Sequence, residues 1–109
     1  MKAYRSGEIV LLSFPFADAT EAKRRPALII LDTGDQDVIV ARATSQAAQT
    51  AFDVELAEWQ QAGLLFPSVV WVHKVATLAK SLIERRLGML IPRDWAQVRA
   101  RIHQLWTSI

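Results

Sequence analysis

The side chains best suited to chemistry stand in a basic run, Lys23-Arg24-Arg25-Pro26. Pro26 fixes its own φ angle and biases Arg25 towards an extended conformation, so the Arg25 side chain has a defined direction. A guanidinium held at the edge of a sheet can bind a phosphate through two parallel hydrogen bonds. The run therefore predicts an anion site. The alternative is a solvated loop that keeps a sheet edge from aggregating.

Two other groups of side chains extend this prediction. Thr44 and Ser45 follow an apolar strand-like segment, where their hydroxyls can donate to a phosphate oxygen or simply cap backbone amides. The alternation of side chains along a strand puts Trp71 and His73 on one face. If that face is open, Trp71 can stack a nucleobase beside a titratable imidazole. If the face is core, Trp71 packs and His73 is a buried, hydrogen-bonded histidine.

Metal and thiol chemistry find no support in the residue pattern. The chain has no cysteine, which excludes a disulfide, a thiolate nucleophile and a cysteine zinc site. Asp32, Asp35 and Asp37 lack the spacing of a calcium loop, and Gly34 explains them as a turn. Chemistry without a metal or cofactor is therefore expected. The basic residues of segment 80–86 and of the C-terminal segment are interpreted as solvated faces or, alternatively, as an extended phosphate track; those of the C-terminal segment are Arg93, Arg99 and Arg101.

Composition is typical of one small soluble domain spanning residues 1–109. Apolar residues make up 51% of the 109 residues, enough for a packed interior. The formal net charge is only +2, so the placement of charges, and not their excess, has to carry any argument for nucleic-acid binding. The N-terminus lacks the apolar stretch of a signal peptide, and the longest strongly apolar run, 27–31, is too short to span a membrane. A cytoplasmic location is expected.

The elements that must position these residues are mostly strands. Short runs rich in β-formers predict strands at 8–14, 27–31, 38–43, 53–56, 68–75 and 81–87. Polar loops are expected at 15–24 and 44–50, a turn at 32–35, and one or two helical turns at 57–62 closed by Gly63. From Pro92 the apolar period becomes helical, with a stripe formed by Trp95, Val98, Ile102, Leu105 and Trp106. This order predicts a mostly β fold, a curled antiparallel sheet or small barrel with one terminal helix packed on it.

Taken in order, these segments resemble the MazF/PemK family of toxin ribonucleases from bacterial toxin–antitoxin pairs. The similarity covers nearly the whole chain and lies in segments 7–10, 14–16, 23–30, 43–45, 68–78, 80–83 and 86–88, followed by the C-terminal helix. The resemblance implies an SH3-like barrel that forms a homodimer, binds single-stranded RNA in grooves near the dimer interface and is neutralised by a cognate antitoxin. It implies metal-independent cleavage that leaves a 2′,3′-cyclic phosphate and a 5′-hydroxyl.

The resemblance also assigns roles to residues. In the family, the arginine before the proline and a threonine that ends the third strand are catalytic, and these correspond to Arg25 and Thr44. Arg24, Ser45 and Gln46 are expected to bind RNA beside them. Some members carry an arginine and an aspartate, two residues apart, on the strand that corresponds to 68–75.

At these two positions this chain has Trp71 and His73. We therefore assign RNA binding to Trp71 and acid–base catalysis to His73 as hypotheses. The departure leaves open a degenerate member that binds RNA or antitoxin without cutting. A plain adapter for protein ligands is another alternative.

A further alternative is a toxin that poisons gyrase, since one such toxin shares this fold and acts through a Trp-Gly-Ile terminus. Residues 106–109 resemble that terminus only loosely, and they are expected to pack on the barrel.

Overall fold

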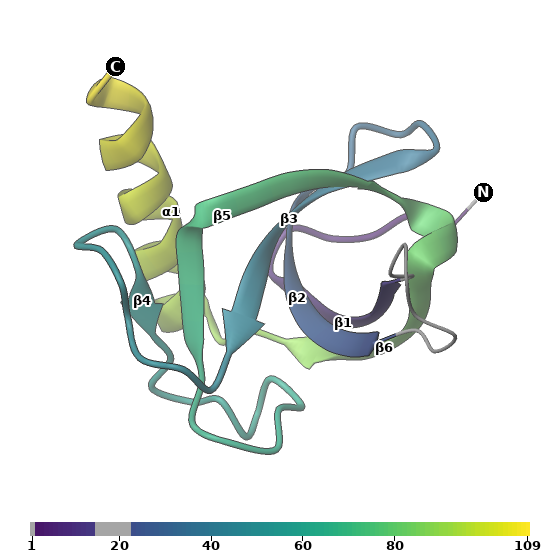
Figure 1. Ribbon diagram of the computed structural model, residues 1–109, viewed down its shortest axis with the longest axis horizontal. Helices are drawn as coiled ribbons and strands as arrows, with labels where there is room; N and C mark the ends of the chain where they lie inside the picture. Colours follow the sequence, from purple (N-terminus) through teal and green to yellow (C-terminus); the bar gives the residue numbers. More distant parts are fainter. Residues whose placement is uncertain (1, 15–22) are drawn as a thin grey trace.

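The computed structural model describes residues 2–14 and 23–109, so most of the expected loop 15–24 lies outside the described residues. The described chain forms a curved sheet with a helix at one end (Figure 1). In chain order its elements are β1 (Glu8–Phe14), β2 (Lys23–Leu31), β3 (Asp37–Thr44), β4 (Val54–Glu55), β5 (Val69–Ala79), the 3₁₀ turn η1 (Lys80–Leu82), β6 (Ile83–Met89) and α1 (Pro92–Thr107). The mostly β fold with a terminal helix is confirmed.

The sheet is antiparallel and strongly curled, and among the described residues it is not closed. Its strand order is β4-β5-β3-β2-β1-β6, so β4 and β6 are its two edges. Curvature is concentrated in β5, because Arg42 on β3 lies opposite Trp71 whereas the preceding Ala41 lies opposite Val75. The extra residues on β5 bend it sharply, as an enlarged β-bulge does. The bend separates a buried first half of β5 from an exposed middle.

The three central strands are buried on both faces, as the continuous apolar run at 27–31 predicted. On β2, Leu28 packs in the core between the sheet and α1, whereas Ala27 and Ile29 pack in a second core inside the curl. Alternate side chains of β1 and β3 divide in the same way between the two cores. The ends of these strands are therefore held on both sides, which fixes the side chains that project from them.

The basic run belongs to a strand and not to a loop. β2 begins at Lys23, four residues before the expected start, and residues 23–26 pair with β1 only. Pairing with β3 begins at Ala27. Pro26 has no N–H to donate, so it is tolerated where β2 has a neighbour on one side only. Arg25 lies opposite Leu12 on β1, which pairs on its other side with Ile83 on β6.

Several other boundaries differ from the expected ones. β5 runs on to Ala79, and β6 begins at Ile83 and ends at Met89. Residues 57–63 form turns without a helix, although Gly63 does close them in the left-handed region, with φ of 85°. Residues 32–36 connect β2 and β3, where the Asp32 carboxylate accepts a hydrogen bond from the Gly34 amide at 2.8 Å, as expected for a turn.

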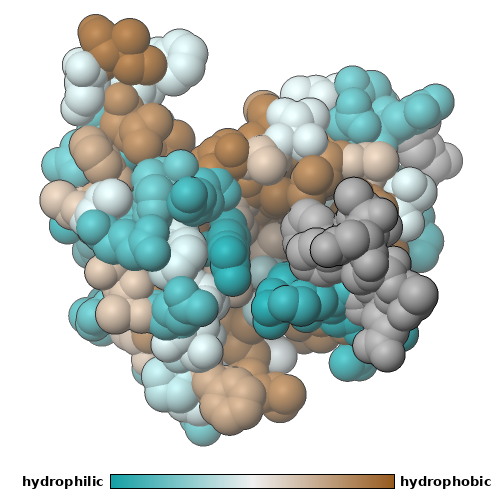
Figure 2. Space-filling view, in the orientation of Figure 1, coloured by the Kyte–Doolittle hydropathy of each residue, from teal (hydrophilic) through white to brown (hydrophobic). Residues whose placement is uncertain are grey.

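Helix α1 packs its first half on the sheet and projects beyond it with its second half (Figure 1). Val98 is fully buried, whereas Trp106 is 74% exposed and Ile109 is 94% exposed. The prediction that residues 106–109 pack on the barrel was therefore wrong, because the helix is longer than the sheet that covers it. Figure 2 shows apolar side chains gathered at this projecting end. Within the described residues, no helix has the length and apolar character needed to cross a membrane.

The buried Asp94 ties the start of α1 to the segment after β4. It is only 2% exposed, and its carboxylate accepts hydrogen bonds from the amides of Ala57 and Glu58 at 3.1 and 3.0 Å. A carboxylate in the first turn also suits the positive end of the helix dipole. This contact fixes the helix against the loop region that leads towards β5.

Candidate functional site

The described residues form a cleft of about 600 Å³ between β6, the ends of β2 and β3, and the loop before β5. Its charged lining consists of four arginines, and no described lining residue is acidic. The polar lining residues follow β3. The lining relevant to chemistry is Arg25, Arg42, Thr44, Ser45, Gln46, Arg85 and Arg86. A cationic hollow of this kind in a chain with a net charge of only +2 concentrates positive potential at one place.

Arg25 lies at the start of β2 with an exposed side chain. Among the described residues it makes no hydrogen bond or ion pair, so its five N–H donors are available to a ligand. Its neighbour Arg24 projects to the other face of β2 and is ion-paired with Glu84 at 2.7 Å, with 68% of its side chain exposed. Arg24 does not line the cleft. The structure thus separates the two adjacent arginines.

Thr44, Ser45 and Gln46 are brought to the same cleft by the end of β3. The Thr44 hydroxyl oxygen accepts a hydrogen bond from the Gln46 amide at 3.2 Å. This bond occupies an oxygen lone pair, so the hydroxyl hydrogen of Thr44 is left to donate to a ligand. Arg25 and Thr44 therefore present to one cavity a hydroxyl donor and a guanidinium that is unpaired within the described part of the chain.

Three further arginines line the cleft. Arg42 lies next to Thr44 on the alternating pattern of β3, and its guanidinium stacks over the Trp71 ring at 5.0 Å. Arg86 is ion-paired with Glu8 at 2.9 Å and also stacks over the Tyr4 ring, which fixes its position. Arg85 is exposed.

Sequence reasoning anticipated the two β6 arginines only as an alternative, and it missed Arg42. The available signal for Arg42 was a lone charge in an apolar strand.

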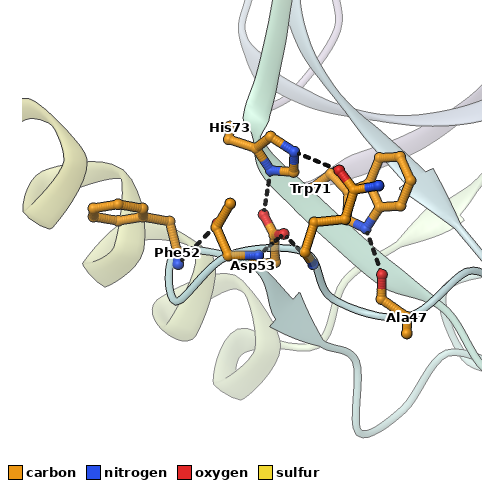
Figure 3. A network of polar contacts seen from close by, with 7 residues as sticks. Ala47, Phe52, Asp53, Trp71 and His73 are labelled. Carbon is orange, nitrogen blue, oxygen red and sulfur yellow. Dashed lines mark hydrogen bonds and ion pairs between the residues drawn. The ribbon is translucent and has the colours of Figure 1, made fainter.

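His73 and Trp71 do not line the cleft. His73 projects from β5 towards the loop after β3, with its Nδ1 2.8 Å from Asp53 Oδ1 and its Nε2 2.9 Å from Gln49 Oε1 (Figure 3). Trp71 is 3% exposed and donates its Nε1–H to the Ala47 carbonyl at 3.1 Å. Both side chains thus hold the segment that follows Thr44.

Asp53 is the centre of this network, which we call the loop clasp (Gln49, Thr50, Asp53 and His73). Its side chain is fully buried, and Oδ2 accepts hydrogen bonds from the amides of Gln49 and Thr50, each at 2.9 Å. Burial raises the pKa of the Asp53 carboxyl, but the hydrogen bonds from His73 and the two amides outweigh it, so its pKa lies below the usual value. The folded structure therefore stabilises the ionised form of the Asp53 carboxyl.

The chemistry open to the cleft is anion binding. Guanidinium groups and a hydroxyl can hold the oxygens of a phosphate and stabilise charge that develops on it. Among the described residues, no group of three or more histidine, aspartate or glutamate side chains is placed to hold a metal ion.

The fold and this cleft can be compared with known proteins. A sequence profile described as "PemK-like, MazF-like toxin of type II toxin-antitoxin system" matches residues 5–106. The chain belongs to this PemK/MazF toxin family. A search of curated proteins finds no match.

Solved structures of this family share the fold. One is a MazE–MazF structure from Deinococcus radiodurans, with 23% identity, 100% of each chain covered and a TM-score of 0.79. Another is a mycobacterial endoribonuclease in complex with its cognate antitoxin, with 16% identity, 96% of each chain covered and a TM-score of 0.77. The Mycobacterium tuberculosis toxin MazF-mt6 has 22% identity and a TM-score of 0.73, over 92% of this chain and 96% of its own. At these identities the likeness establishes the fold.

Proposed function

We propose that this protein is the toxin of a type II toxin–antitoxin pair and acts as a metal-independent endoribonuclease on single-stranded RNA. The observation that carries the proposal is the cleft in which Arg25 and Thr44 meet, lined by four arginines and, among the described residues, by no carboxylate. Membership of the PemK/MazF family supports a toxin. Two of its structural neighbours are named endoribonucleases, which supports the activity.

The proposed reaction needs little chemistry from the protein. The RNA 2′-hydroxyl oxygen attacks the adjacent phosphorus, the bond from phosphorus to the 5′-oxygen breaks, and the products carry a 2′,3′-cyclic phosphate and a 5′-hydroxyl. The 2′-hydroxyl proton passes to water and the departing 5′-oxygen takes up a proton from water, so the reaction consumes no net proton. Because the nucleophile belongs to the substrate, alignment and charge stabilisation supply most of the rate. Arg25 binds the non-bridging phosphate oxygens, and the Thr44 hydroxyl donates one more hydrogen bond.

For His73, the contacts favour a positioning role over proton transfer. Its two ring nitrogens are hydrogen-bonded to Asp53 and Gln49, and His73 lies outside the cleft lining. In this role His73 and Trp71 hold the chain that carries Thr44, Ser45 and Gln46, and the last two bind RNA beside Arg25. That His73 itself transfers a proton stays a prediction, tested below through the pH dependence of the rate.

The matched pair Arg25→Ala and Arg24→Ala tests the proposal, because the two arginines are adjacent and only Arg25 lines the cleft. Each variant is incubated with a long RNA in EDTA, and the cleavage sites and product ends are mapped. Arg25→Ala is expected to lower the rate about 10²–10³-fold, as the loss of one charge-stabilising donor does. Arg24→Ala is expected to stay within about twofold, because Arg24 lies outside the cleft lining and is ion-paired with Glu84; a large loss would instead support the RNA-binding role that the resemblance implies for Arg24. Full cleavage by Arg25→Ala would overturn the assignment, and loss of wild-type cleavage in EDTA would overturn metal independence.

The partners follow from the same proposal. We propose a cognate antitoxin, a homodimer and a cytoplasmic site of action. Two of the structural neighbours are MazE–MazF structures, and a third is an endoribonuclease in complex with its cognate antitoxin, which supports an antitoxin partner. Co-purification with a candidate antitoxin, with loss of RNA cleavage in the complex, tests the first partner. The mass of the free protein in solution tests the homodimer.

A second candidate function is gyrase poisoning, favoured by the exposed end of α1. Trp106 and Ile109 stand clear of the sheet and are open to a partner. A supercoiling assay on relaxed plasmid decides between the candidates. Inhibition that is lost in Trp106→Ala, without RNA cleavage, would replace the nuclease proposal, whereas RNA cleavage with normal supercoiling would exclude this candidate.

A further inference from the structure

Two large apolar side chains stand exposed on the loop before β5, at the rim of the arginine cleft. Leu65 is 84% exposed and Phe66 is 65% exposed, and both line the cleft. Figure 2 shows apolar side chains projecting at the edge of the molecule where Figure 1 draws the loops that precede β5. Exposing an aromatic ring to water forgoes the free energy of its burial, so its position calls for an explanation.

The loop presents Phe66 on a fixed backbone. Leu64, two residues earlier, is only 8% exposed and packs in the core between the sheet and α1. Pro67, the next residue, restricts the Phe66 backbone to extended conformations. The Ser68 hydroxyl donates to the Phe66 carbonyl at 2.7 Å, and the Ser68 carbonyl accepts from the Leu56 amide at 3.0 Å. An exposed side chain on an anchored backbone loses little entropy when it binds a flat ligand.

The base of the loop is also held against the strand that carries two of the arginines. Gly63 lies so close to β6 that a Cβ there would be 2.1 Å from the Leu87 carbonyl oxygen. In the same way, a Cβ on Gly88 would be 2.4 Å from the Ala62 carbonyl oxygen. The loop and β6 therefore touch backbone to backbone, and the aromatic rim keeps a fixed relation to the cationic wall.

We propose that Phe66 stacks on a nucleobase of single-stranded RNA next to the phosphate bound at Arg25, and so helps to determine which sequences are cut. The proposal rests on the nuclease function proposed above and adds a residue to it. One cavity is lined both by guanidinium donors and by an exposed ring, a combination that suits the phosphates and bases of a nucleotide chain. Among the described residues the lining has no carboxylate, which favours a polyanion over a mixed-charge peptide.

Binding tests this without requiring cleavage. The probes are fluorescent oligonucleotides of about ten nucleotides, a typical length for a single-strand site. All sugars are 2′-O-methylated, which blocks the attacking oxygen. One set carries bases, and a matched oligomer has the same sugar–phosphate backbone without bases. Wild type is compared with Phe66→Ala, Phe66→Trp and the control Trp106→Ala, which removes a similarly exposed aromatic ring that lies outside the cleft lining.

Phe66→Ala is expected to weaken binding of the base-carrying oligonucleotides about 5- to 150-fold, the effect of losing one base–aromatic stack. It should leave binding of the base-free oligomer unaffected, Phe66→Trp should retain affinity, and Trp106→Ala should stay within about twofold of wild type. Equal affinities of wild type and Phe66→Ala for every oligonucleotide would overturn the proposal, as would a Phe66→Ala defect confined to binding an antitoxin.

A parallel cleavage assay on unmodified RNA separates the two proposals. Cleavage by wild type together with unchanged binding by Phe66→Ala would overturn the stacking role and leave the nuclease function standing. Phe66-dependent binding without any cleavage would overturn the nuclease function and leave the stacking role standing. A wild-type protein that binds no oligonucleotide would overturn both proposals.

Discussion

Replacing Asp53 with alanine tests whether the loop clasp holds the segment that follows Thr44. The buried Asp53 carboxylate accepts hydrogen bonds from two backbone amides and bonds to the His73 ring. In Asp53→Ala, the two amides and the His73 ring lose their hydrogen-bond partner. The Gln49 amide belongs to an exposed residue and can turn to water, whereas the Thr50 amide and His73 are partly buried. At about 1–3 kcal/mol for each of these two groups left unsatisfied, the expected loss is about 2–6 kcal/mol in the free energy of unfolding.

Asp35→Ala is the matched control, since Asp35 also accepts two hydrogen bonds in a turn, from the Thr33 hydroxyl at 3.3 Å and the Asp37 amide at 2.9 Å. This turn is exposed, so water replaces the carboxylate and the expected loss is about 0.5 kcal/mol. Urea unfolding at neutral pH measures both variants. Equal losses for Asp53→Ala and Asp35→Ala would refute the clasp.

The pH dependence gives the clasp a second test. Because the pKa of Asp53 in the folded protein lies below its ordinary value of 3.8, its contribution to stability is present above about pH 4 and is lost as the pH falls further. The difference in the free energy of unfolding between wild type and Asp53→Ala should therefore become smaller below about pH 4. A difference that stays constant would show that the carboxylate charge does not stabilise the loop.

His73→Ala separates positioning from proton transfer. If His73 positions the loop, the variant loses cleavage rate at every pH and keeps the shape of the wild-type pH–rate profile. If His73 transfers a proton, one limb of that profile disappears.

Two further predictions concern the frame of the fold. Asp32→Asn removes the ion pair with Lys80, whose hydrogen bond at 2.8 Å, together with backbone amides, lowers the pKa of Asp32 to about 2. Thermal melts should show the variant less stable than wild type above pH 3.8 and nearly equal to it at about pH 2, whereas an unchanged gap would contradict the linkage. Gly63→Ala should cost at least about 3 kcal/mol, because its Cβ would overlap a β6 carbonyl and its φ is 85°. Gly34→Ala, with φ of 93° and open space around it, should cost only about 1 kcal/mol, and equal losses in urea unfolding would refute the close contact.

The sequence predicted the central strands well because their signal is local. A run of β-branched and aliphatic residues such as 27–31 is buried on both faces of a sheet, and the structure confirms this. The start of β2 could not be read locally, since three adjacent cations suggest a loop. In the fold, Glu84 neutralises Arg24 from 60 positions away in the chain, and pairing with β1 extends the strand.

The errors at the helical segments have a similar cause. The stripe on α1 continues to Trp106, but the sheet beneath it ends earlier, so a periodic pattern overstates the buried length. At 57–62 the apolar spacing suggested helical turns, yet the Asp94 carboxylate holds the amides of Ala57 and Glu58 from another element. Tertiary contacts of this kind leave no trace in a short window of sequence.

For the site, the family resemblance grouped four residues that the structure brings together. Arg25 lies near the start of β2, Thr44 ends the neighbouring antiparallel strand β3, and Ser45 and Gln46 follow directly, so all four line one cleft. Arg42 was missed because its side chain crosses to the cleft from within an otherwise apolar strand. The contacts of Trp71 and His73 with the 47–53 segment depend on the folding of that loop, which residue spacing alone does not specify.

The contact between Gly63 and β6 has a consequence for how such a toxin can diversify. With no side chain between the two main chains, either glycine is hard to replace, whereas the side chains of Leu65 and Phe66 are exposed at the rim, so exchanging them should cost the fold little. Natural variation and laboratory selection should therefore conserve Gly63 and Gly88 and change the exposed side chains at the rim. The contact at the base of the loop would stay constant. New sequence preferences would arise by exchanging the exposed side chain at position 66, while the fold is left intact.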